Sequence, residues 1–146
     1  MSEPSRIKQM VFGHFTHCLY PLQKFDSDTE RRFSVILERD SDKWFKPAKG
    51  QFQVFYKLGV EQPEYIPDFV VETARQLLMC ETKARNELGT DEVKAKVDAG
   101  SLWCKHASDH ASRIGSKPWK YLLIPHDQVT EDKRLVDFES FVARAK

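Results

Sequence analysis

The sequence predicts a three-layer α/β domain, a small mixed sheet flanked by helices. The apolar residues follow a helical period over residues 26–40, strand-like patterns over residues 51–84, and a helical period again over residues 91–112. A strand over residues 119–125 and a helix over residues 131–145 then complete the chain. Short links favour antiparallel neighbours, and a helix between two strands favours a parallel crossover, so the expected sheet is mixed.

The first helix and the first strand have clear local signals. Ser27 is a good N-cap, and Glu30 stands three positions later, as in a capping box. The apolar residues that follow at helical spacing are Phe33, Ile36 and Leu37. Residues 51–58 alternate instead, which predicts a strand with one buried side. The side chains on that side are Phe52, Val54, Tyr56 and Leu58.

Two further strands are expected to pair as a hairpin. Residues 64–72 form the first of them, and Pro67 predicts that this strand is irregular or near an edge, because proline has no N–H for the ladder. Residues 76–84 form the second, and the apolar run Leu77–Cys80 is typical of a central strand covered on both faces. The turn between them falls near residues 73–75.

The remaining elements are predicted from apolar spacing and helix-ending residues. Small residues over 91–112 permit a close approach of this helix to the sheet, and Gly115 and Pro118 end it. Residues 119–125 form a buried strand. The residues expected on one face of the last helix, residues 131–145, are Leu135, Phe138 and Val142.

Composition sets limits on the class of protein. The chain has 146 residues, 40% hydrophobic and 31% charged, with a net charge of +1. We expect a flexible N-terminus over residues 1–10 and a single domain over residues 11–146. No apolar run approaches the ~20 residues of a membrane span, and the N-terminus has no apolar signal segment, so we expect a cytoplasmic protein. The odd number and wide spacing of the three cysteines argue against a disulfide framework. The absence of a CxxC pair argues against a structural zinc site.

A candidate active site lies at the end of the predicted central strand. Glu81 and Lys83 point to the same side, about 7 Å apart along the strand, while Thr82 offers its backbone carbonyl. The hairpin places Asp68 beside Glu81. Two adjacent carboxylates repel each other unless a cation lies between them, and Mg²⁺ prefers such oxygen ligands. The alternative is that Glu81 and Lys83 form a surface ion pair and Asp68 is a turn residue.

These residues resemble a known superfamily. Pro67-Asp68 followed by Glu81-Thr82-Lys83 resembles the motif of the PD-(D/E)xK nucleases, whose restriction-endonuclease-like core has the order αβββαβ. A closer resemblance, to the C-terminal endonuclease domain of type III restriction-enzyme subunits, covers nearly the whole chain. The segments that carry it are KFDSDTERRFSVILERD, KWFKPAKGQFQVFYK, EYIPDFVVET, CETKARNEL, LWCKHAS and KPWKYLLIPHDQV.

The resemblance implies a deoxyribonuclease over residues 11–146 that uses Mg²⁺ or Mn²⁺. The implied metal ligands are Asp68, Glu81, Thr82 through its carbonyl, and Glu30; one or two ions are open. Lys83 would orient or deprotonate the attacking water, so the implied catalytic residues are Asp68, Glu81, Lys83 and Glu30. For Glu30 the alternative is a purely structural capping-box residue.

The resemblance also implies partners. These are DNA, a helicase-like motor and a methyltransferase subunit of a restriction or defence system, with no membrane. This chain contains no GxxxxGK[ST] phosphate loop, so it carries no such motor of its own. A non-cleaving DNA-binding or assembly module, an RNA-directed nuclease and a transient homodimer stay open. No helix carries a row of base-reading side chains, so little intrinsic sequence specificity is expected.

Several other residues are candidates for substrate contact. Basic residues before and beside the first expected strand could bind phosphates; they are Lys43, Lys46 and Lys49. Gln51 and Gln53 lie on the polar side of that strand and could face a cleft. Trp44 and Trp119 are expected to pack in the core rather than to stack on a ligand.

Overall fold

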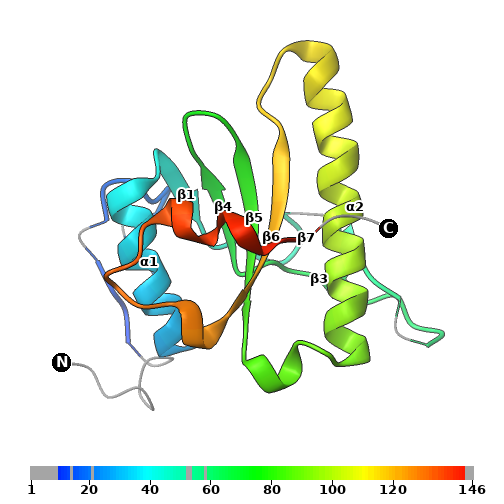
Figure 1. The fold of residues 1–146 in the computed structure, drawn as a ribbon, viewed down its shortest axis with the longest axis horizontal. Helices are drawn as coiled ribbons and strands as arrows, with labels where there is room; N and C mark the ends of the chain where they lie inside the picture. The colour runs from blue at the N-terminus through cyan, green and yellow to red at the C-terminus, as the bar shows by residue number, and fades with distance from the viewer. Residues whose placement is uncertain (1–9, 14, 21, 52–53, 58, 144–146) are drawn as a thin grey trace.

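A β-sheet stands between helices in the computed structural model, which describes every residue except 1–9, 14, 21, 52–53, 58 and 144–146 (Figure 1). The helices are α1 (Asp28–Asp40) and α2 (Asp91–Ile114), with the 3₁₀ helices η2 (Arg85–Glu87), η3 (His126–Gln128) and η4 (Leu135–Phe141). The strands are β1 (Lys43–Phe45), β2 (Val54–Phe55), β3 (Glu64–Tyr65), β4 (Phe69–Glu72), β5 (Leu77–Lys83), β6 (Trp119–Pro125) and β7 (Val142–Ala143). The expected flexible segment 1–10 lies outside the described residues, apart from Met10.

The main sheet is five-stranded, in the order β1-β4-β5-β6-β7. Strands β1, β4 and β5 are antiparallel neighbours, β5 and β6 are parallel, and β7 is antiparallel to β6. The predicted hairpin is present, because Glu72 pairs with Leu77 across the turn. Helix α2 makes the predicted crossover between the parallel strands. The α/β class with a mixed sheet is therefore confirmed.

Both long helices begin at the residues that the sequence indicates. The Ser27 hydroxyl accepts the Glu30 N–H at 3.2 Å, so Ser27 is the N-cap of α1. Thr90 caps α2 in the same way through the Val93 N–H at 3.3 Å. Helix α2 ends at Gly115, whose φ of 70° lies in the left-handed region that favours glycine.

An apolar core lies on each face of the sheet. Alternation along β5 directs Leu78 and Cys80 into the core under α1, and Met79 into the core under α2. Helix α1 fills the first core with its predicted stripe of Phe33, Ile36 and Leu37. Strand β5 is buried along almost its whole length, as expected of a central strand.

The predicted strand over residues 51–58 is largely wrong. Of the described residues in this range, only Val54–Phe55 form a strand, and it pairs with β3 in a separate two-stranded sheet. The expected alternation holds for Val54 and Tyr56, which are buried, and Phe55, which is exposed; Phe52 and Leu58 lie outside the described residues. Strand β1 takes the place beside β4 instead, because its buried Trp44 packs on Phe25 and Phe69.

Two other elements also differ from their predictions. The strand over residues 64–72 is divided into β3 and β4 by residues 66–68, in keeping with the irregularity expected at Pro67. The predicted helix over residues 131–145 is the 3₁₀ helix η4, which buries Leu135 and Phe138. Val142 then pairs with Leu122 in β7, because the open edge of β6 offers backbone partners that a continuing helix could not use. No helix among the described residues has the length and apolar character of a membrane span.

Candidate active site

The predicted site residues lie at the edge of the sheet where β5 and β6 end. Strand β4 runs antiparallel to β5 and pairs Phe69 with Cys80, so the residue before Phe69 lies beside Glu81. This edge is the lower one in Figure 1, next to η2 and η3. The carboxyl ends of parallel strands commonly hold ligand sites in open α/β sheets.

Asp68 is fixed by the backbone of the central strand. Its Oδ2 atom accepts a hydrogen bond from the Thr82 N–H at 2.8 Å and another from the Thr82 hydroxyl at 3.0 Å. The β4–β5 ladder stops at the pair of Phe69 and Cys80, before it reaches Thr82. The Asp68 carboxylate therefore serves as the partner that Thr82 lacks on this side, which gives Asp68 a structural role beside any catalytic one.

Glu81 is a buried carboxylate, only 4% exposed, and therefore no surface residue. Its Oε1 atom accepts a hydrogen bond from the Tyr65 hydroxyl at 3.1 Å, and that hydroxyl lies 2.7 Å from the Tyr121 hydroxyl. Burial raises the pKa of Glu81 well above its usual range, and the nearby Asp68 charge raises it further. The positive charge of Lys83, on the same side of β5, acts in the opposite direction.

Glu30 is the second buried carboxylate of this edge, at 5% exposure. Burial, and then the charge of Asp68, raise the pKa of Glu30 to about 7, while Lys46 lowers it. The Lys46 ammonium donates to Glu30 Oε1 and, at 3.2 Å, to the Asp68 backbone carbonyl. The capping-box alternative therefore explains only the hydrogen bond from the Glu30 N–H to the Ser27 hydroxyl. It does not explain the Glu30 carboxylate, which accepts from Lys46.

The structure thus brings the predicted residues together around Asp68. Asp68 is bonded to Thr82, and its charge acts on both Glu30 and Glu81. Among the described residues, no group of three His, Cys, Asp or Glu side chains is close enough to hold a metal ion. Mg²⁺ needs only one or two carboxylates, because it keeps several of its waters. The pair of Asp68 and Glu81 fits that requirement in donor chemistry.

Lys46 is the member of this edge that the sequence did not distinguish from its neighbours. Lys43 and Lys49 are exposed, whereas the Lys46 side chain is 13% exposed and points into the site. A signal was present: Lys46 stands two positions after the buried Trp44, and therefore on the same side of an extended chain. That side faces α1, where Glu30 lies.

The other candidates for substrate contact lie elsewhere. Trp44 is buried in the core, as expected, and Trp119 packs edge-on against Trp103 with a ring separation of 4.8 Å. Gln51 is exposed and bonded to the Ala48 N–H at 2.6 Å; Gln53 lies outside the described residues.

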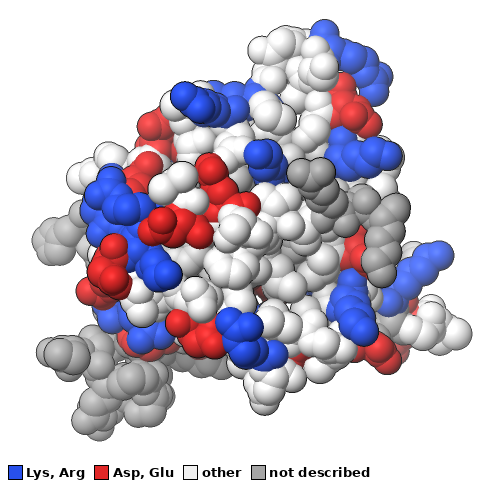
Figure 2. Space-filling view, viewed as in Figure 1, with Lys and Arg blue, Asp and Glu red and all other residues white. Residues whose placement is uncertain are grey.

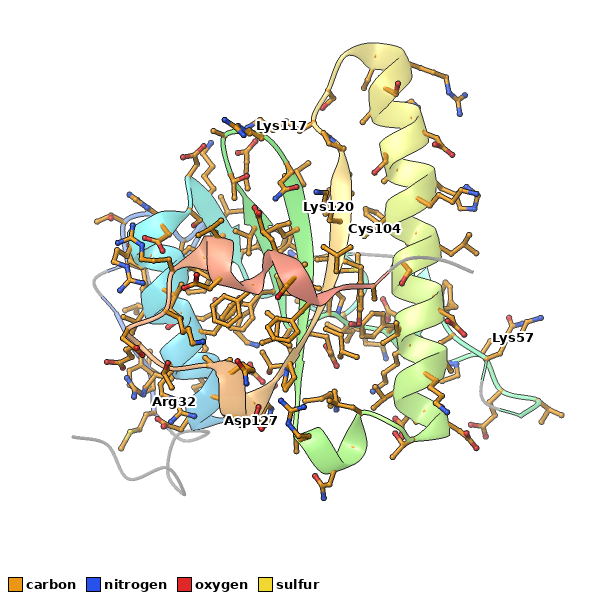
Figure 3. All side chains as sticks on the ribbon, viewed as in Figure 1. Arg32, Lys57, Cys104, Lys117, Lys120 and Asp127 are labelled. Atoms are coloured by element: carbon orange, nitrogen blue, oxygen red, sulfur yellow. The ribbon has the colours of Figure 1, made fainter. Side chains whose placement is uncertain are left out.

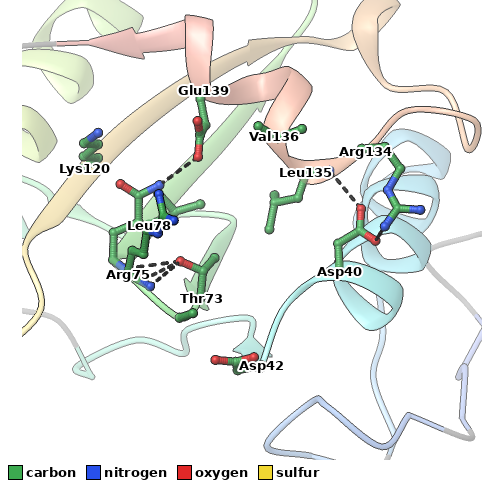
Figure 4. Close-up of a pocket in the computed structure, with 12 residues that line it drawn as sticks. Asp40, Asp42, Thr73, Arg75, Leu78, Lys120, Arg134, Leu135, Val136 and Glu139 are labelled. Carbon is green, nitrogen blue, oxygen red and sulfur yellow. Dashed lines mark hydrogen bonds and ion pairs between the residues drawn. The ribbon is translucent and has the colours of Figure 1, made fainter.

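A hollow also occurs at the opposite edge of the sheet. This cavity has a volume of 540 Å³ and lies between the β4–β5 turn and η4. Residues such as Asp40, Arg75, Lys120 and Glu139 line it (Figure 4). None of the four predicted catalytic residues lines it, so this cavity is separate from the candidate site. Basic and acidic side chains are interspersed on the face drawn in Figure 2, in keeping with the near-neutral net charge.

No protein-family model, curated protein or solved structure matches the chain. A proposed function has to be argued from the residues and geometry of the site itself. The residues concerned are the four predicted catalytic side chains, together with Thr82, Tyr65 and Lys46.

Proposed function

We propose that the chain is a metal-dependent endonuclease domain that hydrolyses DNA phosphodiester bonds. One observation carries the proposal: Asp68 lies close enough to two buried carboxylates, Glu81 and Glu30, for its charge to raise the pKa of both. Buried acids that repel each other lower the stability of the fold. Groups with strongly perturbed pKa values cluster at functional sites. The side chain of Lys83 lies on the same side of β5 as that of Glu81. Its positive charge can stabilise the negative charge that develops in phosphoryl chemistry.

The arrangement of the main sheet supports a restriction-endonuclease-like core of the PD-(D/E)xK superfamily. In chain order, α1 is followed by the antiparallel strands β1, β4 and β5, and then by α2 and the parallel strand β6. This is the αβββαβ order that the resemblance implies, with β1 in the first strand position. By the same resemblance, we propose a restriction or defence role that involves a motor and a methyltransferase subunit.

The residues of the site have separable tasks in this proposal. Asp68 and Glu81 would hold Mg²⁺, with Thr82 fixing the orientation of the Asp68 carboxylate and Tyr65 that of Glu81. The bound ion supplies a water of lowered pKa and polarises the scissile phosphate. Lys83 would hold the attacking water by donating a hydrogen bond to it and would offset the negative charge that develops on the phosphate oxygens.

Plasmid nicking tests the proposal. The purified chain is incubated with supercoiled DNA in Mg²⁺ and in EDTA, beside the variants Lys83→Ala and Lys120→Ala. Lys120 is an exposed lysine of β6 near the opposite edge, so its loss controls for a general loss of positive charge. We expect nicking in Mg²⁺ only, retained by Lys120→Ala and reduced about 100-fold or more in Lys83→Ala, as when a group that stabilises developing charge is removed.

Two other outcomes would point to different functions. DNA retention without nicking, even with a motor subunit added, would identify a non-cleaving DNA-binding or assembly module of the same fold. Cleavage of a labelled single-stranded RNA in preference to the plasmid would identify an RNA-directed nuclease.

A further inference from the structure

Lys46, the residue directly after β1, is held by two elements of the candidate site at once. Its ammonium donates to Oε1 of Glu30 on α1 and to the backbone carbonyl of Asp68, 3.2 Å away, just before β4. The same nitrogen lies 4.7 Å from the centre of the Phe69 ring. With the side chain 13% exposed, this ammonium has lost most of its water and depends on these protein partners.

The fold dictates this placement. The β1–β4 ladder pairs Phe45 with Val70, so continuation of the chain by one residue brings Lys46 beside Phe69. Phe69 belongs to the core under α1, and Lys46 therefore extends along the same face toward the first turn of that helix. Glu30 lies in that turn, with its carboxylate directed at Lys46.

The charges around Glu30 make Lys46 its main compensating group. Three charged side chains act on this buried carboxylate: Asp68 and Asp26 raise the pKa of Glu30, and Lys46 lowers it. A cation in a poorly hydrated site stabilises an ionised carboxylate far more than at a surface. Lys46 thus does for Glu30 what a divalent cation would do for the neighbouring pair Asp68 and Glu81.

On the basis of the proposed metal site, we propose that Lys46 is a built-in counter-ion that competes with the divalent cation for Glu30. In the metal-free protein Lys46 occupies Glu30 Oε1. Glu30 can turn to a cation held by Asp68 and Glu81 only after Lys46 gives up that oxygen. Lys46 is therefore a positioning residue: it acts through Glu30 and sets the affinity of the site for metal.

Magnesium affinity of neutral variants tests this inference. Isothermal titration calorimetry with MgCl₂ compares the intact wild-type chain with Lys46→Met and with Lys46→Gln; the second keeps a donor for the Asp68 carbonyl. We expect a Kd for Mg²⁺ about tenfold lower in both variants, the change that about 1.4 kcal/mol of lost competition produces. Lys46→Arg keeps the charge and is expected to stay within about twofold of the wild type.

Lys117→Met is the matched control. The Lys117 ammonium also joins a carboxylate and a backbone carbonyl, those of Glu72 at 3.1 Å and Thr73 at 2.9 Å. It lies at the opposite edge of the sheet, at the upper end of the molecule in Figure 3. The Kd for Mg²⁺ of this variant should equal that of the wild type, whatever the variant does to stability.

A double-mutant cycle tests whether Lys46 acts through Glu30. In a Glu30→Gln background, Lys46→Met should no longer change the Kd, because the carboxylate for which the two cations compete has been removed. An unchanged or higher Kd in both Lys46→Met and Lys46→Gln would overturn the inference and leave the nuclease proposal standing. Absence of Mg²⁺ binding in the wild type and in every variant would overturn both.

Discussion

Gly100 lies where α2 packs on β6, and its replacement by alanine tests how closely this helix approaches the sheet. A β-carbon at Gly100 would lie 2.5 Å from Cε2 and 2.7 Å from Cδ2 of Tyr121, and 3.2 Å from Cε2 of Tyr65. Carbon atoms in contact prefer separations of about 3.5–4.0 Å. Both rings are about 1% exposed, so neither can move without displacing its own neighbours.

The expected magnitude follows from three contributions. Alanine is favoured over glycine inside a helix by about 1 kcal/mol. An extra carbon in a well-packed core costs about 1–3 kcal/mol. A shift of the Tyr65 and Tyr121 rings also weakens the hydrogen bonds that lead to Glu81, each contributing about 1 kcal/mol. The balance predicts that Gly100→Ala lowers the free energy of unfolding by about 2 kcal/mol.

Urea denaturation followed by circular dichroism measures this difference. The matched control is Gly89→Ala, because a β-carbon at Gly89 meets nothing within 4 Å and the residue is exposed. The control should stay within about 0.5 kcal/mol of the wild type. A Gly100→Ala chain as stable as the wild type, or more stable, would refute the close contact, since helix propensity would then be the only contribution. Replacing the ring with a smaller side chain in Tyr121→Leu should reduce the loss of stability caused by Gly100→Ala. The effects of the two substitutions on the free energy of unfolding should therefore not be additive.

Two further predictions concern the acids of the site. The pKa of Glu30 is raised from 4.5 to about 7, so its contribution to stability is fully present below pH 4.5 and is lost as the pH rises through 7. We compare the free energy of unfolding of the wild type with that of Glu30→Gln, in EDTA, across this pH range. The wild-type value minus the variant value should fall by about 3 kcal/mol as the pH rises. A difference that stays flat or rises would contradict the raised pKa of Glu30. Asp68→Asn keeps an oxygen for the Thr82 N–H and removes the charge. We expect the stability of Asp68→Asn to stay within about 1 kcal/mol of the wild type, whereas Asp68→Ala loses about 1–3 kcal/mol. Both variants should abolish the stabilisation of the fold by Mg²⁺. If Asp68→Asn is still stabilised by Mg²⁺, Asp68 is not a metal ligand.

The elements that could be predicted are those determined by local sequence. The apolar run Leu77–Cys80 marks the central strand, and the cap Ser27 marks the first turn of α1. Strand β1 has three residues and β7 has two, which is too short for a periodic signal. Both exist because a neighbouring strand offers an unpaired edge, and that is a property of the assembled sheet.

The site residues that could be predicted are likewise those determined by local sequence. Alternation of side chains along one strand places Glu81 and Lys83 on the same side, and a hairpin places Asp68 near them. The Tyr65–Tyr121 hydroxyl pair under Glu81 was not predicted, because its members come from β3 and β6, far apart in the sequence. The partner of Lys46 was missed for the same reason, since it requires α1, β1 and the start of β4 together.

Asp68 links the fold to the chemistry of the site. The β4–β5 ladder ends at Phe69, and the Asp68 carboxylate then accepts the hydrogen bond of the Thr82 N–H that the ladder leaves unpaired. This fixes a negative charge beside Glu81, which two buried tyrosines already separate from water. Acids held together by the fold repel each other, and a cation that binds them relieves the repulsion only in the folded state. Metal binding and folding are then linked through the same residues, and Mg²⁺ at 100 times its Kd would add about 2.7 kcal/mol to stability.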